Sequence, residues 1–135
     1  MLDQRFAASV HIMALLAAHD EELQTSEFLA EGLRTNPTVV RRLLAKLAEA
    51  GLVKSFKGKS GGVKIAKLPK EITLKDIYKA STDKALINCR EADVPKACKV
   101  SCSMKEIFEG VADGLEATSM AYLAKIKLSD ILAKI

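Results

Sequence analysis

Residues 36–53 (NPTVVRRLLAKLAEAGLV) constrain the fold more than any other part of the chain, because they predict both ends and the buried face of one helix. Asn36 can cap a helix whose first residue is Pro37, and Gly51 can end that helix in a left-handed conformation. Apolar residues spaced i, i+3, i+4 and i+7 predict a buried face. These residues are Val40, Leu43, Leu44 and Leu47.

The segments on either side of this helix complete a winged helix-turn-helix motif. A shorter helix at 26–33, capped by Thr25 or Ser26, precedes it and is joined to it by a tight turn. Two short strands, at 52–57 and 63–67, follow it and enclose a glycine-rich tip. The predicted fold is therefore mainly α with a small β wing.

Further helices are expected outside this motif. The run at 6–19 is apolar on almost all sides and therefore belongs in the centre of the fold. A short helix at 72–80, with Thr73 as its cap, follows the wing. A long helix is expected from 104 to about 125, and Ser129 is expected to cap a last short helix near the end of the chain.

The long helix predicts a dimer interface. It would span about 33 Å, more than a domain of this size needs internally. Its apolar residues share one face, and these are Met104, Ile107, Phe108, Val111, Leu115 and Tyr122. An apolar face that extends beyond its own domain is typically buried against another subunit, so we expect a homodimer. We divide the chain into a winged helix-turn-helix region at 1–82, a cysteine-containing loop at 83–103 and a dimerisation region at 104–135.

Basic residues are concentrated in the predicted motif. Ten of the eleven Lys and Arg of the first 70 residues lie at 34–70, where Glu49 is the one acid, so this segment carries a net charge of +9. Residues 71–135 contain ten residues of each sign. A local positive field suits a polyanion such as DNA. A solvated basic face without a partner would carry the same charge, so charge alone does not decide between the two.

Other classes of protein are not indicated. The apolar run at 6–18 is too short to cross a bilayer and lacks the basic lead of a signal peptide, so we expect a cytoplasmic protein with no membrane partner. The sequence GKSGG at 58–62 lacks the leading glycine of a phosphate-binding loop. No nucleophile–base pair or paired carboxylates are recognisable, so an enzyme is not expected. The rival is an interaction module that binds a partner protein through the long helix, without DNA.

Four segments together resemble the Rrf-two family of bacterial winged-helix transcriptional regulators. They are residues 37–52, the wing KGKSGGV at 57–63, ITL at 72–74 and LSDIL at 128–132, and the resemblance extends over nearly the whole chain. It implies a homodimer that binds palindromic double-stranded DNA through the helix at 37–50 and the wing, with the long helix as dimer interface. We expect a repressor, and the resemblance implies that cysteines sense its signal.

The resemblance and the charge pattern identify candidate DNA contacts. The first turns of a recognition helix reach base edges, whereas flanking groups hold phosphates. We expect Thr38, Arg41 and Arg42 to read bases, and Lys57 and Lys59 to contact the backbone or the minor groove. The full expected set is Asn36, Thr38, Arg41, Arg42, Lys46, Lys57, Gly58, Lys59 and Ser60. By resemblance, Arg41 replaces an acidic base reader of the iron–sulfur regulator, so the operator should differ.

Three cysteines, Cys89, Cys98 and Cys102, leave three interpretations open. Their odd number favours a thiol or metal site over a disulfide framework. By resemblance, three thiolates would ligate an iron–sulfur cluster, although the family's fourth ligand is replaced here by Lys105 or Arg5.

The second interpretation is a thiol switch. Cys98 and Cys102 are one turn apart if helical, and Lys96, Lys99 and Lys105 would lower the pKa of a nearby thiol. In the third interpretation the cysteines have no role. No cofactor is then required, and the regulator responds to a protein partner or a small effector.

Overall fold

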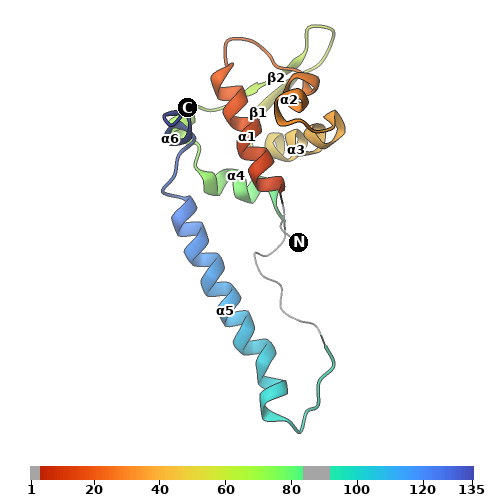
Figure 1. The fold of residues 1–135 in the computed structure, drawn as a ribbon, viewed down its shortest axis with the longest axis vertical. Coiled ribbons are helices and arrows are strands. Elements are labelled where there is room, and N and C mark those ends of the chain that lie inside the picture. Colours follow the sequence, from red (N-terminus) through yellow and green to blue (C-terminus); the bar gives the residue numbers. More distant parts are fainter. Residues whose placement is uncertain (1–3, 84–91) are drawn as a thin grey trace. The chain divides into compact units, whose positions relative to one another are not determined.

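The fold is described from a computed structural model, which describes residues 4–83 and 92–135 (Figure 1). Its elements are α1 (Arg5–Ala18), α2 (Ser26–Leu33), α3 (Pro37–Glu49), β1 (Val53–Phe56), β2 (Gly62–Ile65), the 3-10 helix η1 (Pro69–Glu71), α4 (Leu74–Ser81), α5 (Lys99–Leu123) and α6 (Leu128–Leu132). The chain divides into two compact units, Met1–Asp83 with Leu123–Ile135, and Lys84–Tyr122. The mainly helical fold with one small antiparallel sheet among the described residues confirms the predicted fold class.

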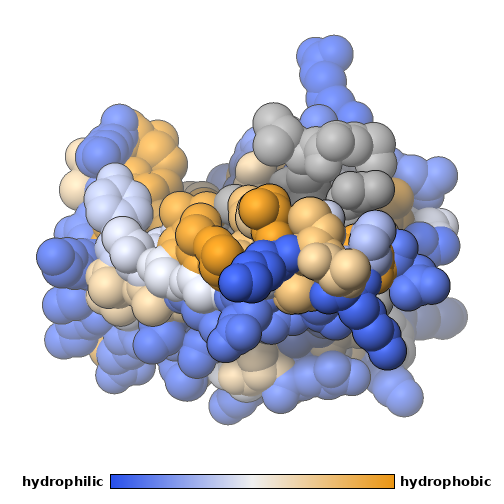
Figure 2. Space-filling view, turned by 90° about the horizontal axis from the view of Figure 1, so that it is seen from below, coloured by the Kyte–Doolittle hydropathy of each residue, from blue (hydrophilic) through white to orange (hydrophobic). Residues whose placement is uncertain are grey.

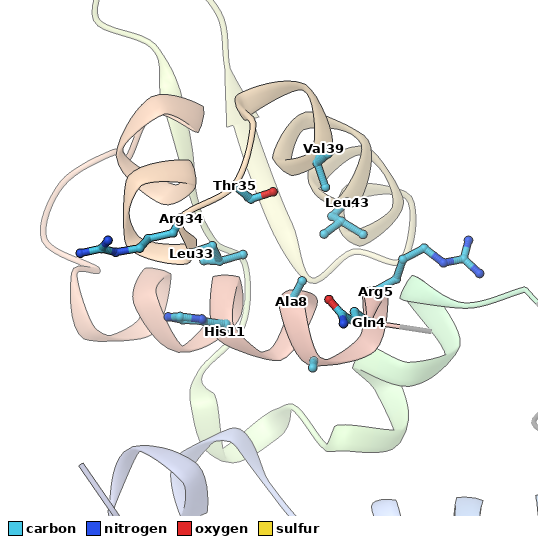
Figure 3. A pocket seen from close by; sticks show the side chains of 10 residues that line it. Gln4, Arg5, Ala8, His11, Leu33, Arg34, Thr35, Val39 and Leu43 are labelled. Carbon is cyan, nitrogen blue, oxygen red and sulfur yellow. The ribbon is translucent and has the colours of Figure 1, made fainter. Parts of the chain in front are cut away.

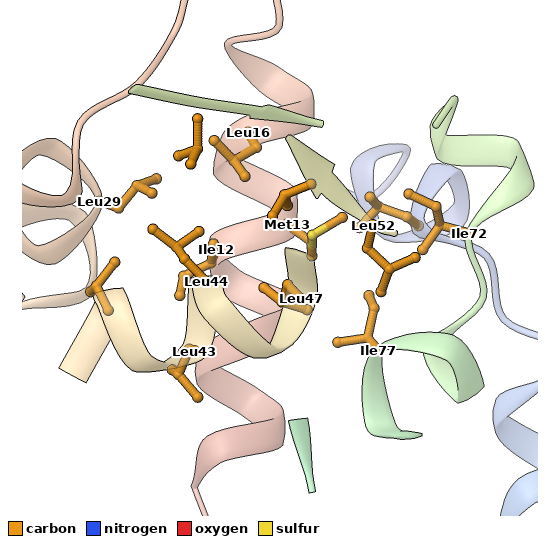
Figure 4. Close-up of a cluster of buried hydrophobic side chains, with 14 of the residues drawn as sticks. Ile12, Met13, Leu16, Leu29, Leu43, Leu44, Leu47, Leu52, Ile72 and Ile77 are labelled. Carbon is orange, nitrogen blue, oxygen red and sulfur yellow. The ribbon is translucent and has the colours of Figure 1, made fainter. Parts of the chain in front are cut away.

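The core of the first unit is aliphatic and is built around α1, as the apolar run at 6–19 predicts (Figure 4). Ile12, Met13 and Leu16 of α1 are fully buried. The predicted face of α3 packs against them, and its members are Val40, Leu43, Leu44 and Leu47, each at most 5% exposed. Burial of this face leaves the opposite side of α3 in solvent.

The turn between α2 and α3 is closed by residues that the sequence identifies. Thr25 Oγ1 accepts a hydrogen bond from Phe28 N–H at 3.1 Å and caps α2. Asn36 Oδ1 accepts from Thr38 N–H at 2.8 Å and caps α3. Between the two helices, Arg34 adopts a left-handed conformation with φ 53°, which ends α2. The helix-turn-helix is therefore held by local hydrogen bonds.

The wing is an antiparallel hairpin in which Val53 pairs with Ile65 and Phe56 pairs with Gly62. Its strands are shorter than the sequence predicts. A third backbone segment joins its edge, because Gln24 N–H donates to Val63 O at 2.9 Å and Val63 N–H donates to Gln24 O at 2.8 Å. This bridge ties the wing to Gln24, the residue before the N-cap of α2.

The predicted cap of the final helix is wrong. The structure places Lys127, not Ser129, at the N-cap of α6, and Asp130 Oδ2 accepts a hydrogen bond from Lys127 N–H at 2.9 Å. The reason is a backbone bridge one residue further on, in which Leu128 N–H donates to Ile72 O at 2.8 Å. That bridge fixes where the helix can begin. Thr73, by contrast, caps α4 as predicted.

The second unit contains most of α5. This helix begins at Lys99, five residues before the boundary inferred from the sequence, so the segment assigned to a loop at 83–103 ends in helix. Cys98 O accepts from Cys102 N–H at 3.1 Å, and the helical turn therefore includes both cysteines. The first turn contains β-branched and small polar residues that have weak helix propensity, which is why its helicity was not predicted.

Candidate nucleic-acid interface

The exposed side of α3 carries the residues expected to read bases. Thr38, Arg41 and Arg42 are all exposed near the start of the helix, and Lys46 is half-buried one turn later. Because their spacing is i, i+3, i+4 and i+8, they share one face. The N-terminal end of the helix also has a partial positive charge, which attracts an anion such as a phosphate. This face can therefore meet a negatively charged groove.

Asn36 has a structural role in addition to the one expected. Its side-chain oxygen is engaged as the cap of α3, so only its amide group is left for another partner. Loss of such a cap typically costs about 1 kcal/mol of stability. Asn36 thus fixes the start of the helix that presents Thr38 and Arg41.

Arg41 is held by an acid that the sequence did not reveal. Its Nη2 lies 2.9 Å from Glu27 Oε1 on α2, and the two side chains are 55% and 66% exposed. An exposed pair of this kind adds at most about 1 kcal/mol to stability. Its main effect is on geometry, because it orients the guanidinium of Arg41. The partners are 14 positions apart in sequence, and no periodic pattern predicted the contact.

The wing tip presents the remaining expected residues to solvent. Lys57, Gly58, Lys59 and Ser60 are all exposed. Gly58 has φ 107°, a conformation that favours glycine, and its carbonyl accepts from Gly61 N–H at 3.0 Å to close the tip. Two ammonium groups on a tight turn suit phosphates or a narrow groove.

Gly61 and Gly62 are required by the wing itself. The atoms closest to both positions belong to the chain itself. A Cβ on Gly61 would collide with the carbonyl oxygen of Phe56, and one on Gly62 would lie 2.7 Å from Gln24 O. Their role is therefore to let the hairpin and its bridge close.

An aromatic residue on the wing was also missed. Phe56 is 45% exposed at the end of β1, and the Lys64 ammonium lies 5.5 Å from its ring centroid. A cation over an exposed ring contributes about 0.5–1 kcal/mol. The contact holds the Lys64 charge close to the surface of the wing.

The structure describes two of the three cysteines. Cys89 lies outside the described residues, whereas Cys98 and Cys102 are both exposed free thiols. The Ser101 hydroxyl, with the backbone N–H groups of Ser101 and Val100, lowers the pKa of the Cys98 thiol below its usual value. The lysines named from the sequence are not the cause. The Ser101 hydroxyl and the free N–H groups at the start of α5 stabilise the thiolate instead.

The two described cysteines do not by themselves fit an iron–sulfur cluster, which typically takes four protein ligands. In the described part of the chain, no group of three or more His, Cys, Asp or Glu side chains is placed to hold a metal ion. No helix in the described ranges is long and apolar enough to cross a membrane.

The apolar face expected on α5 is exposed to solvent. No residue of this helix is buried, and the exposed fractions of its large apolar side chains range from 36% to 69%. The expected interface residues are all in this exposed set, which includes Met104, Ile107, Phe108, Val111, Leu115 and Tyr122. Figure 2 shows hydrophobic side chains exposed among hydrophilic ones on the face seen from below. Such a surface is typical of a protein–protein interface.

A cavity that the sequence did not predict lies beside the helix-turn-helix. It has a volume of about 470 Å³ and is lined by α1, the α2–α3 turn and α3 (Figure 3). Figure 3 shows His11 and Arg34 at one end and Arg5 at the other, with the apolar side chains of Leu33 and Leu43 between them. Arg5 Nη1 also lies 3.7 Å from Asp83 Oδ1. The volume is within the range of small-molecule sites.

Comparison with known proteins gives one family. The family model for Rrf2, described as an iron-dependent transcriptional regulator, matches residues 2–134. YwnA of Bacillus subtilis (strain 168), a candidate HTH-type transcriptional regulator, is 31% identical over 136 residues, which cover 98% of this chain and 97% of YwnA.

Solved structures show the same fold at lower identity. A candidate transcriptional regulator from Lactobacillus plantarum has a TM-score of 0.86 and 21% identity, with 98% of this chain and 89% of that chain covered. IscR from T. potens has a TM-score of 0.71 and 24% identity, with 99% and 87% covered.

Proposed function

This chain belongs to the Rrf-two (Rrf2) family of transcriptional regulators, and we propose that it represses transcription as a homodimer bound to a palindromic DNA operator. The resemblance found in the sequence is thereby confirmed, and so is the expectation that the chain is a regulator rather than an enzyme. The homodimer, the palindromic operator, repression and a cytoplasmic location are the parts that we propose beyond family membership.

One observation carries the proposal of DNA binding. The base-reading candidates of α3 and the lysines of the wing tip are exposed within the same compact unit, in the segment whose net charge is +9. Buried residues on the other side of α3 hold the helix against α1. A recognition helix in the major groove with a wing over the adjacent backbone would use both surfaces. We assign residues 1–82 to DNA binding on this basis.

Sequence selection from a random duplex library tests this function. The full-length protein should enrich a palindromic sequence, and its affinity for that duplex should fall steeply as salt rises, because phosphate contacts release counterions. A protein that enriches no sequence, or whose affinity is insensitive to salt, would contradict DNA-directed regulation. It would favour the module that binds a partner protein through α5.

Replacing Arg41 by alanine should reduce affinity for the selected duplex by about 1–3 kcal/mol and relax the preference at one base pair. The reason is that an arginine can donate two hydrogen bonds to the O6 and N7 of guanine. Fluorescence anisotropy with the selected duplex measures the loss, and repeated selection measures the preference. The control is a scrambled duplex, which should lose less affinity. An unchanged selected sequence would remove Arg41 from the base-reading set.

Replacing Lys57 by alanine should weaken binding to the selected and scrambled duplexes alike. Lys57 is exposed at the wing tip, and a phosphate contact carries no sequence information. The slope of log affinity against log salt should fall by about one. Lys79→Ala on α4 is the matched control, because it also removes an exposed charge but lies outside the predicted interface. Equal effects of the two variants would mean that only overall charge matters.

The exposed apolar face of α5 supports the proposal of a homodimer. Its side chains lie on a helix with no buried residue, and a second copy of the same helix would cover them in a symmetric interface. Gly110 and Gly114 have open space at the Cβ position, so another backbone can approach closely there. We assign residues 104–135 to dimerisation and residues 83–103 to sensing.

The lowered pKa of the Cys98 thiol supports redox sensing as the signal. Near neutral pH Cys98 should therefore react with iodoacetamide faster than an N-acetylcysteine amide, and its rate should persist to lower pH. Mass spectrometry of the reduced protein across pH measures this. Ser101→Ala should slow the reaction near neutral pH, because it removes the first cause of the shift. A rate equal to that of the amide would remove the support for a thiol switch.

An iron–sulfur cluster remains the alternative signal. Anaerobic purification followed by visible absorption spectroscopy tests it directly. A coloured protein that loses its colour when Cys98 is replaced by serine would favour a cluster. A colourless protein with all its thiols free would leave the thiol switch.

The cavity beside the turn favours a third route, regulation by a small effector without a cofactor. It is lined by His11, Arg34 and Arg5, with Leu33 and Leu43 between them, which suits a small molecule with an anionic group and an apolar body. Because Leu43 belongs to α3, binding there would act on the recognition helix. Phenylpropanoate and its uncharged amide are suitable probes, and only the acid should shift the amide resonances of these residues.

A further inference from the structure

The ion pair of Arg41 and Glu27 connects the proposed base-reading helix with the helix before it. Arg41 Nη2 and Glu27 Oε1 are 2.9 Å apart, and both side chains are more than half exposed. The pair is therefore accessible to a bound duplex. Within the described residues, the neighbouring Arg42 has no acidic partner of this kind.

We propose that Glu27 is a positioning residue that sets the DNA sequence preference by orienting Arg41, an inference that rests on the proposed function. A guanidinium has five N–H donors in a planar fork. The bond to Glu27 uses the Nη2 side and leaves other donors for guanine, which accepts two hydrogen bonds. A guanidinium that is already held loses less conformational freedom when it meets a base.

The negative charge of Glu27 also strengthens the sequence preference. Glu27 lies in the first turn of α2. In a helix-turn-helix, the first helix crosses the DNA backbone, so a carboxylate there is repelled by phosphates. Arg41 offsets this repulsion only while it stays paired. A DNA sequence that binds Arg41 only when it leaves Glu27 exposes the unpaired carboxylate to the phosphates and is therefore bound less tightly. The pair thus disfavours wrong sequences in addition to favouring the right one.

Glu27→Gln tests the inference, because glutamine keeps the size and an acceptor oxygen but removes the charge. The wild-type protein first selects its preferred duplex, and both proteins are then titrated with that duplex and a scrambled one. The ratio of the two affinities should fall by about fivefold in Glu27→Gln, the effect expected of one exposed ion pair. The scrambled duplex should bind as tightly as before, or more tightly, because a repulsive charge is gone.

Two further variants separate positioning from general charge. Glu31→Gln removes the same charge from the exposed surface of the same helix and should leave the ratio unchanged. In an Arg41→Gln background, Glu27→Gln should change the ratio no further, because the group that it positions is absent.

An unchanged ratio in Glu27→Gln overturns the inference, and so does an equal fall in Glu31→Gln. If the wild-type protein itself prefers no sequence, the proposed function fails and the inference fails with it. Circular dichroism spectra that match the wild type establish that each variant is folded.

Discussion

Val111→Asp on α5 is expected to convert the protein from a dimer to a monomer and to lower affinity for its operator by at least about hundredfold. Val111 is 55% exposed in the chain, so the substitution should not disturb the fold of the monomer. In a dimer the aspartate would be buried without a partner, which is strongly unfavourable. Affinity then falls because each half of a palindrome must be bound separately.

Light scattering coupled to size-exclusion chromatography measures the oligomeric state, and anisotropy with the selected duplex measures the affinity. Ala117→Asp is the matched control. Ala117 is exposed six residues from Val111, on a different side of the helix, and should tolerate the charge as a dimer. A wild-type protein that is monomeric at the concentrations that bind DNA would contradict the role given to α5. So would a dimeric Val111→Asp variant.

The parts of the fold that could be predicted are those whose determinants lie close together in sequence. The cap at Asn36 and the left-handed Gly51 that follows α3, with φ 76°, are consequences of residue types whose conformational preferences are local. The buried face of α3 follows from a periodicity that only one side of a helix can satisfy. The exposure of Arg41 and Arg42 then follows from the burial of the opposite face.

The features that could not be predicted depend on pairs of residues far apart in the chain. The bridge from Gln24 to Val63 and the bond from Leu128 to Ile72 join backbone groups, and backbone hydrogen bonds carry no residue-type signal. The contact of Glu27 with Arg41 likewise has no recognisable pattern in the sequence, because exposed acids on helices are common. The candidate site could therefore be located from the sequence, but the orientation of its central arginine could not.

Leu47→Ala is the second substitution for which we expect a large effect: it should lower the free energy of unfolding by about 2–5 kcal/mol. Leu47 is fully buried on α3, within the cluster that includes Ile12 and Met13 of α1 and Ile77 of α4 (Figure 4). Truncation removes apolar contacts and leaves a cavity that rigid neighbours fill only in part. Because α3 would be less firmly held against α1, affinity for the selected duplex should also fall.

Urea denaturation followed by circular dichroism measures the stability, at one fixed protein concentration because a dimer is stabilised by mass action. Leu47→Met keeps the volume and should cost less than about 1.5 kcal/mol. Leu68→Ala is the surface control, because Leu68 is 55% exposed and its truncation opens no cavity. If Leu47→Ala were no more destabilising than Leu68→Ala, α3 would not be anchored by its apolar face. The orientation of Arg41 would then have to depend on the turn and on Glu27 alone.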